Sequence, residues 1–187
     1  MHRSFVHLLA LSAFLAAGEA RAHDLGLMLD GGVPDGANLS VAYRPWSFVR
    51  VHAGGGTNLV SPGFRAGLTL LLPGGLVGCA EYGHYFEGNA NGIWRSISGH
   101  PDADVPSLHE LGYDYANFRA GLELGPSWFK FQLHAGMSYM TGQVKQLGAT
   151  LTKAASSEGT TVTFGSDPTV SVWSVSARLG FVVYFGL

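Results

Sequence analysis

Charged residues are scarce in this chain. Lysine, arginine, aspartate and glutamate together make up 13% of the 187 residues, whereas soluble domains usually carry about 25%. A surface that faces water on all sides needs more charge than this to stay soluble. The net charge of −2 also provides no basic surface for binding, so we expect no nucleic-acid partner.

Cysteine and long apolar runs are lacking as well. The single cysteine, Cys79, excludes an internal disulfide, and we interpret it as a small packed side chain. Beyond the N-terminal segment, no apolar stretch reaches the roughly 18 residues of a transmembrane helix. Two architectures remain for a chain of such low charge: a soluble β-sandwich or barrel, and a transmembrane β-barrel.

The N-terminal segment, residues 1–22, has the three parts of a secretory signal peptide. Arg3 lies near its start, an apolar run covers residues 5–17, and "ARA" at 20–22 gives a small-x-small cleavage pattern. The apolar run is shorter than the roughly 20 residues that span a bilayer, so we predict cleavage. The remaining 23–187 is long enough for one domain and carries nine basic and twelve acidic residues, a net charge of −3.

What the sequence does contain is a series of strand-like segments. In "FKFQLHAGMSYM" (129–140), apolar residues alternate with polar or small ones, which is the period of a strand with one apolar face. Seven further segments alternate in a similar way, so we predict an all-β fold. The eight predicted strands are 24–30, 37–43, 48–54, 64–72, 76–86, 115–124, 129–140 and 170–187.

The predicted connections alternate in length. The second, fourth and sixth are the tight "RPWS", "PGG" and "GPSW", whereas the odd-numbered ones are longer, above all the loops 87–113 and 142–167. Transmembrane barrels have short turns on the periplasmic side and long loops outside, whereas a Greek-key sandwich gives no reason for such alternation. The sequence therefore predicts an eight-stranded antiparallel up-and-down transmembrane β-barrel.

The two faces of the predicted strands differ in a way that indicates which one faces lipid. The polar faces hold few charges and many Gly, Ser and Ala, which suits a narrow lumen that only side chains can fill. The other faces carry Leu, Val and Phe, and aromatic residues of the kind that gather at bilayer interfaces lie near strand ends. These aromatic residues are Tyr43, Trp46, Trp128, Trp173 and Tyr184.

Charged residues on the lumen face predict a buried ionic network. Glu81 and Arg119 lie at similar heights on neighbouring predicted strands, and buried charges must be paired. We therefore interpret the set as a plug of salt bridges, with a narrow gated path for protons or small solutes as the alternative. The predicted members are Arg50, Arg65, Glu81, Arg119, Glu123, Lys130, His134 and Arg178.

The register of the sixth and seventh predicted strands gives a sharper expectation. A two-residue turn at 126–127 would place Glu123 opposite Lys130 and Arg119 opposite His134. Residues that face each other across two strands share one environment. Polar residues would then meet polar residues on the lumen face.

The terminal strand "ARLGFVVYFGL" and this architecture resemble the small eight-stranded outer-membrane barrels of the OmpA/OmpX/OmpW type. The resemblance covers residues 24–187, although these proteins usually end in an aromatic residue and this chain ends in Leu187, with Phe185 in the same phase. It implies a barrel in the outer membrane of a Gram-negative cell. We expect a structural, anchoring or loop-presenting role, with lipid and possible protein partners at loops 87–113 and 142–167.

Two other functions stay open: a small pore for solutes or hydrophobic compounds, and a lipid-modifying enzyme. We predict no catalytic residues, because His134 and Ser138 share a strand with Cα atoms about 13 Å apart and no Ser/His/acid set surrounds His84. The loop 99–110 holds histidines and carboxylates that could bind a cation, but their spacing matches no motif. We therefore predict neither a metal site nor a cofactor.

Overall fold

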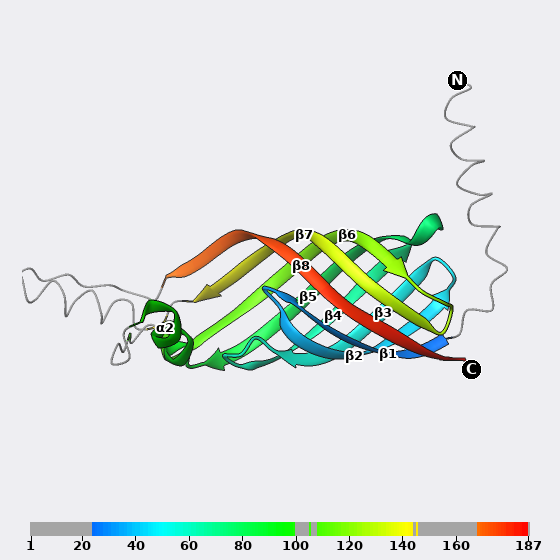
Figure 1. Cartoon of the computed structure of the whole chain (residues 1–187). Helices are drawn as coiled ribbons and strands as arrows, with labels where there is room; N and C mark the ends of the chain where they lie inside the picture. The colour runs from blue at the N-terminus through cyan, green and yellow to red at the C-terminus, as the bar shows by residue number, and fades with distance from the viewer. Residues whose placement is uncertain (1–23, 100–104, 106–107, 144, 146–167, 187) are drawn as a thin grey trace, which may run out of the picture.

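The structure is a computed structural model, and Figure 1 shows its course. The predicted signal segment, residues 1–22, lies outside the described residues, as does most of the predicted loop 142–167. The described residues are 24–99, 105, 108–143, 145 and 168–186.

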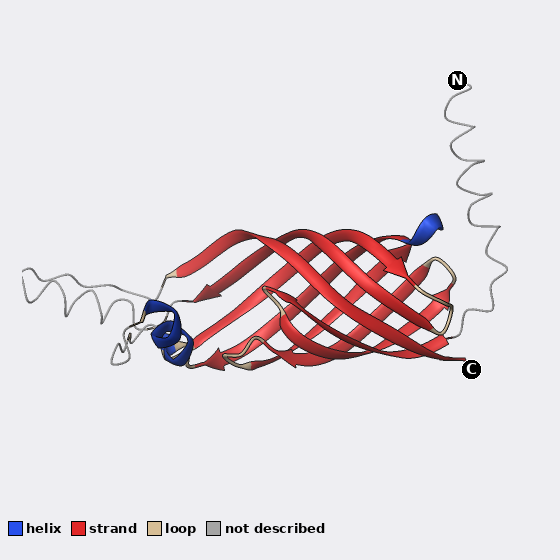
Figure 2. Cartoon of the chain, in the orientation of Figure 1, coloured by secondary structure: helices blue, strands red, loops and turns tan. Residues whose placement is uncertain are grey.

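Eight antiparallel strands form one closed barrel, as Figure 2 shows. Each strand pairs with the next along the chain, and the last pairs with the first, so the predicted all-β, eight-stranded, up-and-down fold is confirmed. The strands are β1 (Asp24–Val33), β2 (Gly36–Trp46), β3 (Val49–Thr57), β4 (Pro62–Leu71), β5 (Leu76–Gly88), β6 (Leu111–Leu124), β7 (Phe129–Gln143) and β8 (Thr169–Gly186).

The two ends of the barrel differ. Asp24 and Gly186 pair at one end, which we call the terminal end, and the helix α2 (Asn91–Ser98) lies at the other, the loop end (Figure 1). This helix lies within the predicted loop 87–113 and was not predicted from the sequence. A short 3-10 helix, η1 (Pro73–Gly75), lies between β4 and β5. The described chain contains no helix long and apolar enough to cross a membrane.

The predicted alternation of connection lengths is wrong for half of the loop end. Residues 34–35 and 58–61 connect β1 to β2 and β3 to β4, and they are no longer than the connections at the terminal end. The cause is that glycines read as loop belong to strands. Gly56, for example, pairs with Gly63, and a Cβ on Gly56 would collide with the backbone carbonyl of Ala37 in β2.

The predicted register of β6 and β7 is wrong by two residues. Glu123 pairs with Gln132 and Arg119 with Gly136, because six residues (125–130), rather than two, lie between Leu124 and Phe131, the last paired positions. Gly125 adopts φ +124°, a conformation that favours glycine, and the amide of Phe129 donates to the carbonyl of Pro126 at 3.2 Å. A shift of two residues preserves which face each side chain occupies.

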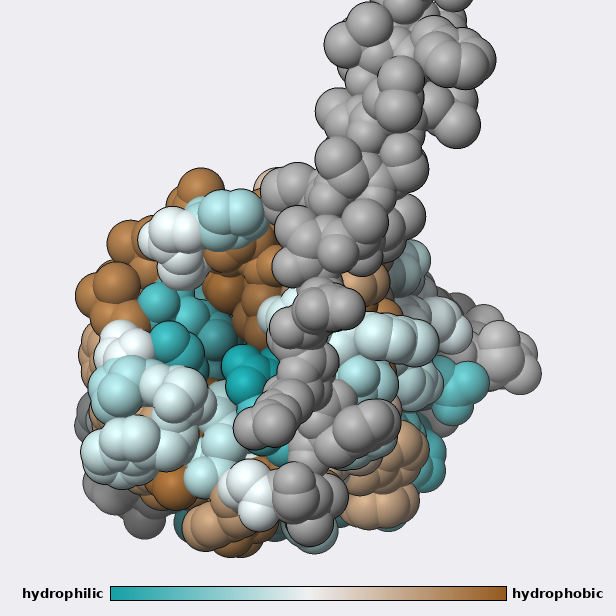
Figure 3. Space-filling view, turned by 90° about the vertical axis from the view of Figure 1, so that its right-hand side faces the viewer, coloured by the Kyte–Doolittle hydropathy of each residue, from teal (hydrophilic) through white to brown (hydrophobic). Residues whose placement is uncertain are grey.

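Side chains alternate between the lumen and the outside as predicted. On β7, Gln132 is 0% exposed and its neighbour Leu133 is 53% exposed. Viewed from the terminal end, hydrophilic residues lie inside the ring and hydrophobic residues form much of its edge (Figure 3). Tyr184 is the exception among the predicted interface aromatics, because its side chain points into the lumen and is buried.

Candidate functional site

The lumen contains equal numbers of buried acidic and basic side chains. Inward positions of the strands, together with the β1–β2 turn, place them in one interior, where unpaired charges would be costly. With the histidines neutral, four arginines balance four carboxylates. They are Arg50, Arg65, Arg119 and Arg178, and Asp30, Asp35, Glu81 and Glu123.

Glu81 of β5 lies at the centre of this network. Its Oε2 accepts a hydrogen bond from Nη1 of Arg178, and its Oε1 lies 3.4 Å from Nη1 of Arg119 and 3.5 Å from Nη1 of Arg65. Its side chain is fully buried. The predicted pairing of Glu81 with Arg119 is therefore present, and three guanidinium groups share one carboxylate.

The β1–β2 turn supplies a second carboxylate to the same region. Asp35 is 0% exposed; its carboxylate accepts a hydrogen bond from Arg119 and lies 3.6 Å from Nη1 of Arg65. Tyr85 donates its hydroxyl to the carbonyl of Asp35, and Tyr113 donates to the carbonyl of Pro34 at 3.0 Å. The turn therefore folds over the lumen and closes part of the loop end.

A simpler pair occupies the lumen toward the terminal end. Arg50 donates two hydrogen bonds to Glu123, one of them at 3.1 Å, and a third to the hydroxyl of Tyr184 at 3.1 Å. Gln132 donates to the same carboxylate at 3.1 Å. Lys130 was predicted to belong to the network but does not: its Nζ is exposed and donates to the carbonyl of Gly125 at 2.6 Å.

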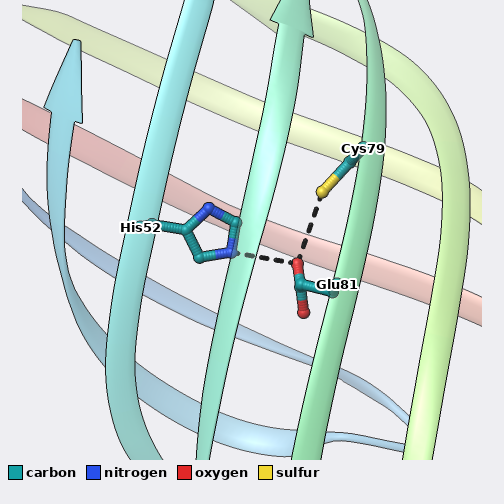
Figure 4. Close-up of side chains that lie close together, drawn as sticks. All are labelled: His52, Cys79 and Glu81. Carbon is teal, nitrogen blue, oxygen red and sulfur yellow. Dashed lines mark hydrogen bonds and ion pairs between the residues drawn. The ribbon is translucent and has the colours of Figure 1, made fainter. Parts of the chain in front are cut away.

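His52, Cys79 and Glu81 form a cluster of possible metal ligands (Figure 4). Oε2 of Glu81 lies 3.3 Å from Nε2 of His52 and 3.4 Å from Sγ of Cys79. Arg178, however, donates to this same oxygen and has Nη2 3.5 Å from the sulfur. The guanidinium group thus fills the position of a cation, and the residues as arranged do not fit a metal.

Neither lumen histidine is arranged for nucleophilic catalysis. Nδ1 of His134 lies 3.0 Å from Nη2 of Arg178, and since a guanidinium can only donate, Nδ1 must accept. Ser176 accepts a hydrogen bond from Nε of Arg119 at 2.6 Å and donates to Val33. Within the described lumen, His52 and His134 contact no serine hydroxyl.

The candidate cation loop 99–110 is only partly described. His100, Asp102 and Asp104 lie outside the described residues. Glu110 lies 3.5 Å from Nζ of Lys145, which also pairs with Glu87 at the loop end. The hydrogen bond with Glu87 raises the pKa of Lys145, so this lysine remains positively charged among the carboxylates.

Seven of the eight predicted network residues lie in the lumen, and sequence reasoning missed two carboxylates. Asp30 lies on β1 at a position whose side chain faces the lumen, where it accepts hydrogen bonds from Arg65. The alternation of residues along this strand could therefore have revealed it. Asp35 gave no such signal, because "PDG" is typical of a solvated turn. His52 lies two positions after Arg50, on the same face of β3, and is also buried.

No family model matches the chain, and comparisons with curated proteins and with solved structures found no match.

Proposed function

We propose that the chain is an outer-membrane β-barrel, similar in kind to the OmpA/OmpX/OmpW barrels, with a structural, anchoring or loop-presenting role. The observation that carries the proposal is the layered composition of the outer wall across β5–β8. Paired residues form rows around the wall. One row is made of four leucines: Leu76, Leu122, Leu133 and Leu179.

Aromatic side chains lie on both sides of this leucine row. Toward the loop end, Tyr139 packs against Trp173 at 5.2 Å between ring centroids. Toward the terminal end, Phe129 packs against Trp128 and Phe181. Tyr139 and Phe129 are ten positions apart on β7, which for a strand tilted by about 40° gives a height of roughly 25 Å. This matches the apolar band of outer-membrane barrels.

The filled lumen supports a structural role over a pore. An eight-stranded barrel leaves room only for its own side chains, and here paired arginines and carboxylates occupy that room. The turn at Asp35 further closes the loop end. The charge network then stabilises the barrel, and the loops 87–113 and 142–167 would be the parts that meet other proteins.

Fractionation of a Gram-negative host tests the location. We expect the protein in the outer membrane, resistant to carbonate and high salt and released by detergent, with His23 as its first residue after signal cleavage. A soluble periplasmic protein would contradict the proposal.

Planar bilayers separate the plug from the alternative pore. We expect no steady current at neutral pH, because no continuous water column fits between the paired side chains. Brief openings are compatible with exchange of partners within a hydrogen-bonded network. A stable conductance that changes in Glu81→Gln or Arg178→Gln would instead support the pore.

A further inference from the structure

The outer wall of β5–β8 carries polar residues where an apolar surface is expected. We call this set the outer polar row, and it crosses the four strands in register near the loop end. Nδ1 of His84 lies 3.0 Å from Oδ1 of Asp114, which also accepts a hydrogen bond from Tyr82 at 2.6 Å. The row consists of His84, Asp114, Thr141 and Ser171.

A pocket opens at this row toward the loop end. Its volume is about 680 Å³, and it is lined by His84, Asp114 and Thr141 together with Glu87, Glu110 and Lys145. Glu87 and Glu110 pair with Lys145, and Asp114 adds a third carboxylate to the lining, so carboxylates outnumber the lysine. Oδ1 of Asp114 accepts both bonds described above, and no bond to its Oδ2 is found among the described residues. The pocket therefore favours a ligand group that is positively charged and carries N–H donors.

A groove of about 700 Å³ lies on the same wall toward the terminal end. It follows a row of small residues, Gly78, Ala120, Ala135 and Ala177, each six positions from a member of the outer polar row. Phe118, Met137 and Trp173 line its side nearest the pocket. Six residues of a tilted strand correspond to roughly 15 Å of depth, so the groove lies at the level of acyl chains when the polar row lies among head groups.

We propose that pocket and groove together bind one phospholipid with a primary-ammonium head group. The ammonium donates to Asp114 and lies beside the aromatic ring of Tyr82, the phosphate lies toward Lys145, and an acyl chain fills the groove. The small residue Ala116 stands between Tyr82 and Tyr139 in the intervening row. This inference rests on the proposed membrane location.

The chemistry of the pocket distinguishes this lipid from others. An anionic head group without an ammonium would meet the surplus of carboxylates, and like charges repel. A choline head group is cationic but has no N–H to donate to Oδ2 of Asp114. We therefore expect phosphatidylethanolamine to bind more tightly than phosphatidylcholine or phosphatidylglycerol.

Quenching of Trp173 by brominated lipids tests the proposal. The full barrel with Trp46, Trp94 and Trp128 replaced by phenylalanine keeps Trp173 as its fluorophore, and it is reconstituted in vesicles with a small fraction of brominated phosphatidylethanolamine, phosphatidylcholine or phosphatidylglycerol. We expect an apparent affinity roughly tenfold higher for phosphatidylethanolamine, the factor that one charge-assisted hydrogen bond provides.

Two variants and one control separate the head-group pocket from the groove. Asp114→Asn should reduce the preference to below about twofold, while quenching by the other lipids is unchanged. Ala135→Leu fills the groove and should weaken quenching at low fractions of every brominated lipid. Ala53→Leu adds the same bulk to the exposed wall at β3, away from the groove, and should behave like the parent.

The outcomes distinguish failure of the lipid site from failure of the proposed function. Equal quenching by the three lipids, or a preference that survives Asp114→Asn, would overturn the lipid site while leaving an inserted barrel. Ala135→Leu behaving like Ala53→Leu would overturn the acyl groove. Absence of quenching by any brominated lipid at any fraction would mean that the barrel does not enter the bilayer, which would overturn both proposals.

Discussion

The carboxylates of the lumen are neutralised in two different ways. Toward the loop end, a shared cluster brings three arginines to three carboxylates: Arg65, Arg119 and Arg178 with Asp30, Asp35 and Glu81. Toward the terminal end, the single pair Arg50–Glu123 is completed by two neutral groups: Tyr184 accepts a hydrogen bond from Arg50, and Gln132 donates one to Glu123. The shared cluster distributes charge among many strands, whereas the ion pair at the terminal end joins β3 to β6.

This difference shows which residues of the shared cluster have no substitute. Arg65 and Arg119 each contact two or more carboxylates, whereas Glu81 is the only carboxylate that Arg178 contacts among the described residues. Loss of Arg119 or Arg178 leaves Glu81 with two other arginines. Loss of Glu81 leaves a buried guanidinium without any carboxylate, so the central acid is less replaceable than Arg119 and Arg178. Arg65 differs from these two, because it is the only arginine that Asp30 contacts among the described residues.

The largest effect is therefore expected for Glu81→Gln. Arg178 would remain buried and unpaired, which costs about 3–5 kcal/mol of unfolding free energy. Equilibrium urea unfolding of the barrel in lipid vesicles measures this loss. A loss below about 1 kcal/mol, the range of exposed ion pairs, would show that Arg178 finds another partner and that the cluster has no central member.

Arg50→Gln should have the next largest effect, about 2 kcal/mol, because Glu123 then keeps only neutral hydrogen-bond donors. Glu123 retains a little exposure, at 7%, so water can solvate part of the stranded charge. The same urea titration gives the comparison. If Arg50→Gln were more costly than Glu81→Gln, the single pair rather than the shared cluster would be the main ionic support.

A double-mutant cycle measures sharing within the cluster. Arg119→Gln combined with Glu81→Gln should destabilise less than the two single changes added together, by about 1–2 kcal/mol, because both single changes remove the same Glu81–Arg119 interaction, which the double variant loses only once. The four unfolding free energies of the cycle give this coupling. Simple additivity would show that Glu81 and Arg119, 3.4 Å apart, do not interact energetically.

The smallest effect is expected for Lys130→Gln. The Nζ of Lys130 is exposed and contacts only a turn carbonyl among the described residues, so the unfolding free energy should change by less than about 0.5 kcal/mol. This substitution also serves as the control for charge removal in the other variants. A loss comparable to that of Arg50→Gln would place Lys130 in the network after all.

Period-two alternation was enough to predict the eight strands and most of the charged side chains that face the lumen. It succeeded because a strand places each side chain by parity alone, so Arg50, Arg119 and Arg178 could be assigned without knowing their partners. It failed where the local backbone decides. The six residues between Leu124 and Phe131 shifted the register by two, and the glycines 55–56 extended β3 into a region read as loop.

The position of a side chain along the barrel axis was harder to predict than whether it faces the lumen or the outside. Lys130 has lumen parity but lies so close to the terminal end that its long side chain reaches the solvent. Asp35 has no strand parity at all, and only the inward fold of the turn places it between Arg65 and Arg119. Both depend on where the strands end, which hydrophobic alternation does not define.

The inward position of Asp35 has a consequence for the order of assembly. This residue belongs to the first hairpin, yet its ionic partner Arg119 is 84 positions further along the chain, and β1 completes the wall only by pairing with β8. A nascent chain with seven strands in place would still hold Arg119 without this partner. Closing the seam also brings Arg178 of β8 to Glu81, so we expect the last ion pairs of the lumen to form together with the closed wall, which penalises a barrel that remains open.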